Sequence, residues 1–232
     1  MKTTKKINTG TIKLTSKNIS EGLLKKTILK SLKNQRVLGD DELLSIRRKL
    51  IPDEGTNRSI YIFAYGSLLW NPTFKYELQI AAKIYGYHRS FCMKTRLGRG
   101  SVKNPGLMLG LDYGGSCHGS VYKLHKKNEV REIDLLFKRE MVTGTYIPKL
   151  LKAELLSKKK VDCLTFVINR ENENYIPDLS LEEISKIISK AHGFFGSCEE
   201  YLNYTITSLS ELKIKDKKMN IIQNLIRENK TK

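Results

Sequence analysis

Along residues 60–65 (IYIFAY), the aromatic side chains of Tyr61, Phe63 and Tyr65 alternate with the aliphatic ones of Ile62 and Ala64. This period of two in an apolar run predicts a strand with at least one buried face. Gly66 and Ser67 interrupt the run, so the chain should turn sharply there. The amides of Gly66, Ser67 and Leu68 would then lie outside any β ladder, free to bind a carbonyl oxygen or a carboxylate. The alternative is a purely structural turn, with Trp70 packed into the core.

The rest of the chain shows further strand and helix patterns. Residues 129–142 (EVREIDLLFKREMV) have the clearest helical spacing, and Gly144 stands where a glycine commonly ends a helix. Ser180 lies three residues before Glu183, the spacing of a capping box, so a helix is expected to start there. Residues 94–106 are rich in glycine and predict a long loop, a type of segment that often carries function. By the same reasoning, strands are expected at 77–91, 107–111, 119–124, 146–151 and 161–169, a turn at 112–118, and helices at 21–32, 40–50, 180–191 and 199–212.

Short strands with glycine turns predict the α+β class, with a bent, mainly antiparallel sheet or a small β-barrel and flanking helices. We expect three parts: a basic N-terminal extension over 1–58, consisting of a tail (1–20) and short helices, a main domain over 59–212, and a basic C-terminal tail over 213–232, helical or frayed. A hydrophobic fraction of 40% in 232 residues supports a substantial core. No apolar run reaches the roughly 20 residues of a membrane helix, and the basic start precedes no signal-type segment, so a cytoplasmic protein is expected.

The formal net charge of +18 raises the possibility of nucleic-acid binding. Residues 1–58 carry 14 basic against 6 acidic side chains, and residues 211–232 carry 7 against 3, so two thirds of the excess lies in the flanks. Apart from Lys158–Lys160, which we interpret as a solvated turn, the central block has no dense basic run interleaved with exposed aromatic residues. Nucleic acid is therefore not an expected partner, except for nonspecific contact by the basic tails.

Glu140 is an acid on the apolar face of the predicted helix 129–142. At about 100° per residue it falls among Ile133, Leu136 and Phe137, which form the buried stripe. Burial disfavours an ionised carboxylate and should raise its pKa toward the value that a general base needs near neutral pH.

Two other acids of this helix, Glu132 and Asp134, project to the sides, as solvated acids do. Glu140 therefore differs from them by position. A structural role remains an alternative for Glu140: a hydrogen bond to a tyrosine, or a salt bridge with one of three cations, Arg99, Lys138 or Arg139.

Cysteine and histidine spacing suggests neither a metal site nor a disulfide framework. The four cysteines form no C-x-x-C pair, and reduced, mostly buried thiols are expected at Cys92, Cys117, Cys163 and Cys198. The histidines also lack the spacing of metal ligands: His88, His118, His125 and His192. No metal and no cofactor is expected.

Five ordered motifs between Tyr61 and Leu212 resemble the ChaC-like γ-glutamylcyclotransferases, which act on glutathione. The motifs are FAYGSLLWNP at 63–72, GYHRSFCM at 86–93, RGSVKNPGLMLGLDYGGSCHG at 99–119, REMVTGTYIP at 139–148 and GSCEEYLNYT at 196–205. Two features are less typical of the family, the segment 95–98 and a serine at position 101. The extension 1–58 has no counterpart in the minimal family core.

The resemblance implies a lyase that releases 5-oxoproline and cysteinylglycine from glutathione in a catalytic domain over 59–212. It implies that the amides of the loop formed by Tyr65, Gly66, Ser67 and Leu68 hold the γ-glutamyl group, and that Glu140 is the catalytic acid/base. Arg99 is a candidate partner for a substrate carboxylate through a bidentate hydrogen bond. Tyr146 and Tyr201 are candidate pocket walls or hydroxyl donors, with plain core packing as the alternative for each.

Two other functions remain open from the sequence. The enzyme could prefer another γ-glutamyl amine as its substrate. The protein could also be a catalytically silent, basic nucleic-acid-binding protein, whose binding would fall steeply with salt and would not depend on Glu140. The sequence leaves the oligomeric state open.

Overall fold

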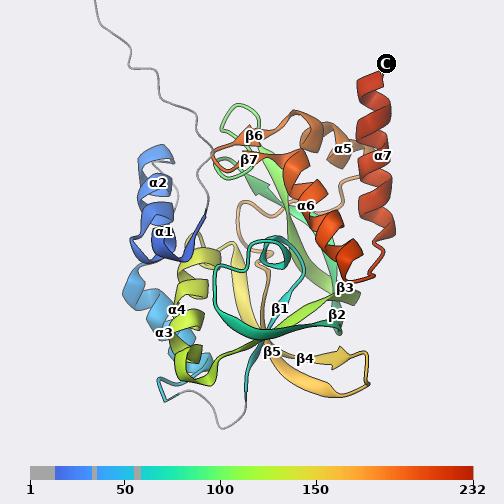
Figure 1. Ribbon diagram of the computed structural model, residues 1–232. Coiled ribbons are helices and arrows are strands. Elements are labelled where there is room, and N and C mark those ends of the chain that lie inside the picture. Colours follow the sequence, from blue (N-terminus) through green and yellow to red (C-terminus); the bar gives the residue numbers. More distant parts are fainter. Residues whose placement is uncertain (1–13, 33–35, 55–58, 232) are drawn as a thin grey trace, which may run out of the picture.

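Five strands of the described chain close into a barrel in the order β1-β3-β2-β4-β5 (Figure 1). The computed structural model describes residues 14–32, 36–54 and 59–231. Neighbouring strands are antiparallel, except that β1 and β5 run parallel and close the barrel. The predicted α+β class with a small, mainly antiparallel barrel is confirmed. The strands are β1 (Tyr61–Ala64), β2 (Tyr76–Thr95), β3 (Gly106–Leu124), β4 (Tyr146–Leu155) and β5 (Lys160–Ile168).

Strand β1 lies between β3 and β5. Tyr61 pairs with Lys123 of β3 and with Cys163 of β5. Ile62, Phe63 and Ala64 are all fully buried because barrel and helices cover both faces of the strand. The end of β1 at Ala64 thus places the following Tyr65–Leu69 loop at a fixed point on the rim of the barrel.

Strands β2 and β3 form one long hairpin, and the loop over 96–105 between them agrees with the predicted long loop. The turn expected at 112–118 is wrong, because β3 continues through these residues. Gly114 and Gly115 have φ angles of 94° and 68°, and they fall where the register with β2 shifts. These glycines absorb an irregularity within the ladder, which glycine tolerates because it has no Cβ.

The helices after β3 gather on two sides of the barrel (Figure 1). A short η2 turn (Lys126–Asn128) leads into α4, which lies beside the N-terminal helices. The predicted helix at 180–191 is confirmed: Ser180 and Glu183 form the expected capping box. The helices and short strands of this part are α4 (Glu129–Glu140), α5 (Leu181–Lys190), β6 (His192–Gly193), β7 (Gly196–Ser197), α6 (Cys198–Glu211) and α7 (Lys217–Thr231).

The N-terminal extension contains three helices, α1 (Ser16–Ser20), α2 (Leu23–Ser31) and α3 (Asp40–Leu50). The last two match the predicted helices. Residues 16–20 were expected to be tail, and α1 corrects this: Thr15 caps it and Ile19 is buried. Five residues cannot stabilise a helix alone, so tertiary packing supplies what the local pattern lacks. The rest of the expected tail, residues 1–13, lies outside the described residues.

The C-terminal tail expected over 213–232 forms helix α7 within the described residues. Met219, Ile222 and Ile226 are buried, and α7 packs against α5 (Figure 1). Asp216, just before α7, pairs with Arg89 of β2 at 2.6 Å. The proposed division of the chain at residues 58 and 212 stays a prediction.

None of the helices in the described ranges combines the length and the apolar character that crossing a membrane requires.

Candidate active site

Glu140 is the last residue of α4, at the end of a buried apolar stripe. Ile133, Leu136 and Phe137 are almost completely buried, as the helical pattern predicts. The side chain of Glu140 is 13% exposed and borders a cavity of about 600 Å³. Gly144, with φ of 63°, ends the helical turn after it. The helix therefore delivers a carboxylate to the wall of a cavity.

The expectation that the other acids of α4 are solvated is wrong for Glu132. Glu132 is buried and accepts a hydrogen bond from the Lys75 amide at 3.3 Å. Glu129 is also buried and accepts from the Ile60 amide at 2.8 Å. Both carboxylates satisfy backbone N–H groups outside the sheet ladder, which buried amides require. Only Asp134, half-buried and paired with Arg47, fits the expectation in part.

Burial raises the pKa of Glu140, and Arg139 opposes this shift. Arg139 Nε lies 2.8 Å from Glu140 Oε1, a buried oxygen, and forms an ion pair with it. The salt bridge considered from the sequence is thus present with Arg139, whereas Lys138 pairs with Asp40. The carboxylate is therefore held by Arg139 while the residue borders the cavity.

Arg139 links Glu140 to the loop after β1. Its guanidinium donates to Ser67 Oγ and to Thr73 Oγ1, both at 2.9 Å, and to the Asn71 carbonyl. Arg139 is itself buried. One guanidinium therefore fixes the distance between the carboxylate and the turn that begins at Ser67.

The loop after β1 is held from both sides. Tyr65 Oη donates to the Phe166 carbonyl at 2.8 Å, and Arg89 Nε donates to the Tyr65 carbonyl at 2.6 Å. Ser67–Leu69 forms the 3₁₀ turn η1. Because β1 ends at Ala64, the amides of Gly66, Ser67 and Leu68 lie beyond the ladder and at the start of this turn, where N–H groups have no intrahelical acceptor.

Tyr146 and Tyr201 are buried and border the same cavity as Glu140. Tyr146 Oη donates to the Leu109 carbonyl at 2.8 Å, and the Leu109 amide donates to Tyr201 Oη at 3.4 Å. Burial raises the pKa of both hydroxyls, so both stay protonated near neutral pH. Tyr201 accepts from Leu109, and its own proton has no acceptor within the described part of the chain.

Arg99 also borders the cavity, and its guanidinium lies 5.6 Å from the Trp70 ring centroid. Its Nη1 donates to the Ser197 carbonyl at 3.1 Å and to Glu200 at 3.3 Å. In the described ranges, Nη2 and Nε have no such partner. The burial of this guanidinium lowers its pKa, an effect that Glu200 opposes.

The cavity brings together five of the eight predicted site residues, namely Ser67, Arg99, Glu140, Tyr146 and Tyr201. The other three, Tyr65, Gly66 and Leu68, are buried and do not border the cavity. Of the predicted loop, Ser67 is the residue that reaches it.

Several residues that border the cavity were not predicted as part of a site. Arg139 was considered only as a structural partner of Glu140, although its position next to Glu140 was a usable signal. Asn174 and Thr145 gave no signal, because isolated polar residues in irregular segments do not reveal what they face. Leu24, Ile28 and Leu32 of the N-terminal extension follow helical spacing, which predicts an apolar face but not what covers it.

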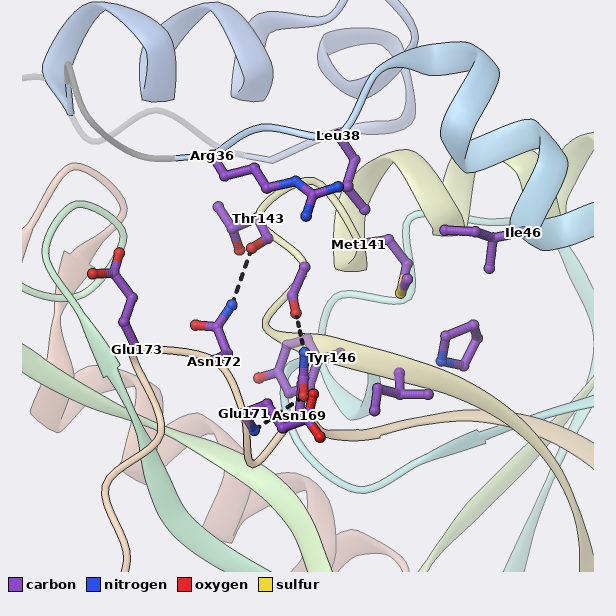
Figure 2. Close-up of a pocket in the computed structure, with 13 residues that line it drawn as sticks. Arg36, Leu38, Ile46, Met141, Thr143, Tyr146, Asn169, Glu171, Asn172 and Glu173 are labelled. Atoms are coloured by element: carbon purple, nitrogen blue, oxygen red, sulfur yellow. Dashed lines mark hydrogen bonds between the residues drawn. The ribbon is translucent and has the colours of Figure 1, made fainter.

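A second hollow, of about 640 Å³, lies behind the segment that joins α4 to β4 (Figure 2). Thr143 and Tyr146 border both hollows, whereas Glu140 borders only the first. Two amide side chains hold this segment: Asn169 donates to the Gly144 carbonyl at 3.1 Å and Asn172 to the Thr143 carbonyl at 3.3 Å (Figure 2). Because this segment leads directly into Tyr146, the two hydrogen bonds help to position that side chain between the two hollows.

All four cysteines are buried free thiols, as expected. Within 14–32, 36–54 and 59–231, no three side chains of the metal-binding types His, Cys, Asp and Glu come together as a possible metal site.

Comparison with known proteins finds a family and relatives to which this chain is similar. The family model of the ChaC-like proteins matches residues 60–229. A glutathione-specific γ-glutamylcyclotransferase of Escherichia coli is 34% identical over 182 residues, which cover 77% of this chain and 78% of that protein. Glutathione-specific γ-glutamylcyclotransferase 1 of Homo sapiens is 30% identical over 154 residues, covering 65% and 69%.

The fold is shared with a solved structure. The crystal structure of a yeast γ-glutamyl cyclotransferase specific to glutathione matches with a TM-score of 0.67 at 20% sequence identity, covering 74% of this chain and 97% of the yeast chain. The family model spans the barrel, the Glu140 helix and most of α7. On the family match and the Escherichia coli relative together, this chain belongs to the ChaC-like protein family.

Proposed function

We infer that this protein is a γ-glutamylcyclotransferase, a lyase that converts glutathione to 5-oxoproline and cysteinylglycine. Its family membership and the names of its relatives support this inference. The observation that carries the mechanism is the position of the Glu140 carboxylate at the cavity, where burial raises its pKa as suits a proton-transfer group.

The substrate supplies its own nucleophile. In a γ-glutamyl amide, the α-amine reaches the γ-carbonyl carbon and closes a five-membered lactam, so the attack is intramolecular. A new C–N bond forms at this carbon while its bond to the amine portion breaks. The hydrogens that the α-nitrogen loses are those that the leaving nitrogen gains. The reaction therefore balances without a co-reactant.

Glu140 serves as the proton carrier in this scheme. As a carboxylate it takes a proton from the α-ammonium, and as an acid it returns a proton to the leaving nitrogen. Arg139 holds the side chain against the cavity wall and keeps the pKa from rising further. Both transfers favour a group that titrates near the working pH, and burial raises the pKa of Glu140 in that direction.

The loop after β1 stabilises the reacting carbonyl. The amides of Gly66, Ser67 and Leu68 bind the γ-carbonyl oxygen or the α-carboxylate of the γ-glutamyl group. The free proton of Tyr201 adds a donor from the opposite element. Arg99 binds a substrate carboxylate through Nη2 and Nε, the two nitrogens that its contacts with Ser197 and Glu200 leave open.

Four unpaired thiols suit a reducing compartment, so we place the protein in the cytoplasm. The second candidate substrate is another γ-glutamyl amine, since the proton transfers involve only the shared γ-glutamyl part and the leaving nitrogen.

The test uses Glu140→Gln, which keeps the size of the side chain and removes its base. Release of 5-oxoproline from glutathione should fall by at least about 10²-fold, as for loss of a positioned acid/base, with the thermal midpoint close to that of the wild type. Glu182→Gln, an exposed change on α5, is the matched control and should leave the rate unchanged.

Near-normal 5-oxoproline release by folded Glu140→Gln would overturn the mechanism. Assaying the wild type against a panel of γ-glutamyl amides settles the substrate, because a preference for one of them over glutathione would favour the second candidate.

A further inference from the structure

The N-terminal helices supply one wall of the catalytic cavity. Leu24, Ile28 and Leu32 are spaced four residues apart, which places them on one face of α2 and its C-terminal end. All three border the cavity that Glu140 borders, together with Leu14 at the start of the described chain. This segment precedes residues 60–229, where the family model matches.

The wall is attached to the turn that follows the Ser67 loop. Asn71 Nδ2 donates to the Leu14 carbonyl at 3.0 Å, and Ser16 Oγ donates to the Thr73 carbonyl. Arg139 binds the same turn through Asn71 and Thr73, and also touches Glu140. A single turn therefore holds both the N-terminal wall and the carboxylate.

A second attachment lies in the first turn of α2. Asp40, the first residue of α3, pairs with Lys25 of α2 at 2.9 Å and with Lys138 of α4 at 3.2 Å. Both bonds lower the pKa of Asp40, so this carboxylate is ionised at neutral pH. The helix is thus tied to the catalytic helix as well as to the turn.

The chemistry of the wall indicates which part of a substrate it meets. The γ-glutamyl end of a substrate carries an ammonium and a carboxylate, which require polar partners such as Ser67, Glu140 and the loop amides. The face of α2 offers only aliphatic side chains at Leu24 and Ile28. Aliphatic groups match an apolar portion of a ligand, and in a γ-glutamyl peptide that portion is the side chain of the leaving amine.

We propose that α2 is a specificity-determining wall, on which Leu24 and Ile28 contact the side chain of the leaving amine and favour a small apolar or thiol-bearing residue over glycine. This proposal rests on the proposed γ-glutamylcyclotransferase function. An added carbon in an apolar pocket typically changes kcat/KM by about tenfold or more. The wild type should therefore prefer γ-glutamyl-cysteinyl-glycine over γ-glutamyl-glycyl-glycine by at least about that factor.

The test compares Leu24→Ala and Ile28→Ala with Leu29→Ala in the full-length protein. Leu29 is a matched control because it lies on the same helix but is 53% exposed and does not border the cavity. The preference between the two peptides should fall at least about threefold in Leu24→Ala and in Ile28→Ala, mainly through KM, as expected for lost binding that is equal in ground and transition states. Leu29→Ala should keep the wild-type preference.

A second measurement separates failure of the wall from failure of the function. Binding of both peptides to the wild type and to Leu24→Ala is titrated by calorimetry at a pH where no turnover occurs, and thermal unfolding confirms that each variant is folded. An unchanged preference and an unchanged ratio of dissociation constants in folded Leu24→Ala would overturn the proposal that α2 determines specificity. If the wild type releases no 5-oxoproline from either peptide, the proposed function fails, and the ratio of dissociation constants still decides for or against the wall.

Discussion

Arg139 and Glu140 are neighbours in the sequence, yet they meet at one cavity wall. Successive side chains of a helix point about 100° apart and do not normally face each other. Here α4 ends at Glu140, and Arg139 reaches across to Ser67 and the Asn71 carbonyl, with its Nε beside the carboxylate. The same arginine therefore affects both the position and the charge state of Glu140.

This pair predicts a specific pH dependence of activity. Glu140 must be ionised to accept a proton, so kcat/KM should fall as the pH drops through its pKa, which burial raises above the usual range of a glutamate. Arg139→Gln removes the cation that lowers this pKa, so the acidic limb of the profile should move to higher pH. The measurement is 5-oxoproline release against pH.

Two control variants separate charge from position. Arg139→Lys keeps a cation but loses the forked contacts with Ser67 and Asn71, so its acidic limb should stay near that of the wild type while kcat falls about 10–10²-fold from misplacement. Arg131→Gln, on the exposed side of α4, should change neither the acidic limb of the profile nor kcat. An acidic limb that stays in place in Arg139→Gln would contradict the assigned role of Arg139.

At the scale of elements, the loop after β1 and helix α6 approach each other closely at Gly66. A Cβ at this position would lie 2.9 Å from Tyr201 Oη, too close for an undisturbed contact. Gly66→Ala should therefore displace Tyr201 from the Leu109 amide or shift the loop, and kcat/KM should fall about 10²-fold, as for a displacement of roughly 1 Å in an active site. Gly39→Ala, where a Cβ meets no atom closer than 3.6 Å, serves as the control in the same assay.

Tyr201→Phe gives a second check of this prediction, because it removes the oxygen that an alanine at position 66 would meet. Gly66→Ala combined with Tyr201→Phe should lose much less activity than the two single changes added together. Full additivity would show that the loop does not depend on this contact.

Sequence patterns predicted elements well where local chemistry determines them. The capping box at Ser180, the glycine after α4 and the apolar stripe that includes Ile133 all act within one or two turns of chain. Patterns failed where the environment of a residue depends on partners far away in the sequence. Glu132 resembles a solvated acid until the Lys75 amide is known to need an acceptor, and Gly114 resembles a turn until its partner strand is known.

The candidate site follows the same rule. Helical phase alone selected Glu140, and the glycine after β1 selected the loop at Gly66, because both depend on local geometry. The wall formed by Leu24 and Ile28 depends on a contact between Asn71 and Leu14, which are 57 residues apart. A single sequence contains no signal for such a contact.

For the whole molecule, a buried cation joins the N-terminal extension to helix α4. Arg47 of α3 is 2% exposed, and it pairs with Asp134 of α4 at 2.8 Å and with Asp53 at 2.7 Å. It also donates to the Ile51 carbonyl at 3.0 Å. Arg48, the next residue, is 54% exposed and pairs with Asp53. These two arginines offer a matched test of what fixes the extension.

Arg47→Gln should destabilise the protein by about 1.5–3 kcal/mol, the range for a hydrogen bond to a charged group, because its buried contacts between α3 and α4 are lost. Arg48→Gln should leave stability almost unchanged, since exposed ion pairs contribute little. Urea unfolding of both variants measures the difference. Equal effects would contradict the idea that Arg47 fixes the extension.

Because α3 also holds α2 through Asp40, Arg47→Gln should in addition weaken the preference for a cysteinyl over a glycyl leaving group, whereas Arg48→Gln should preserve it.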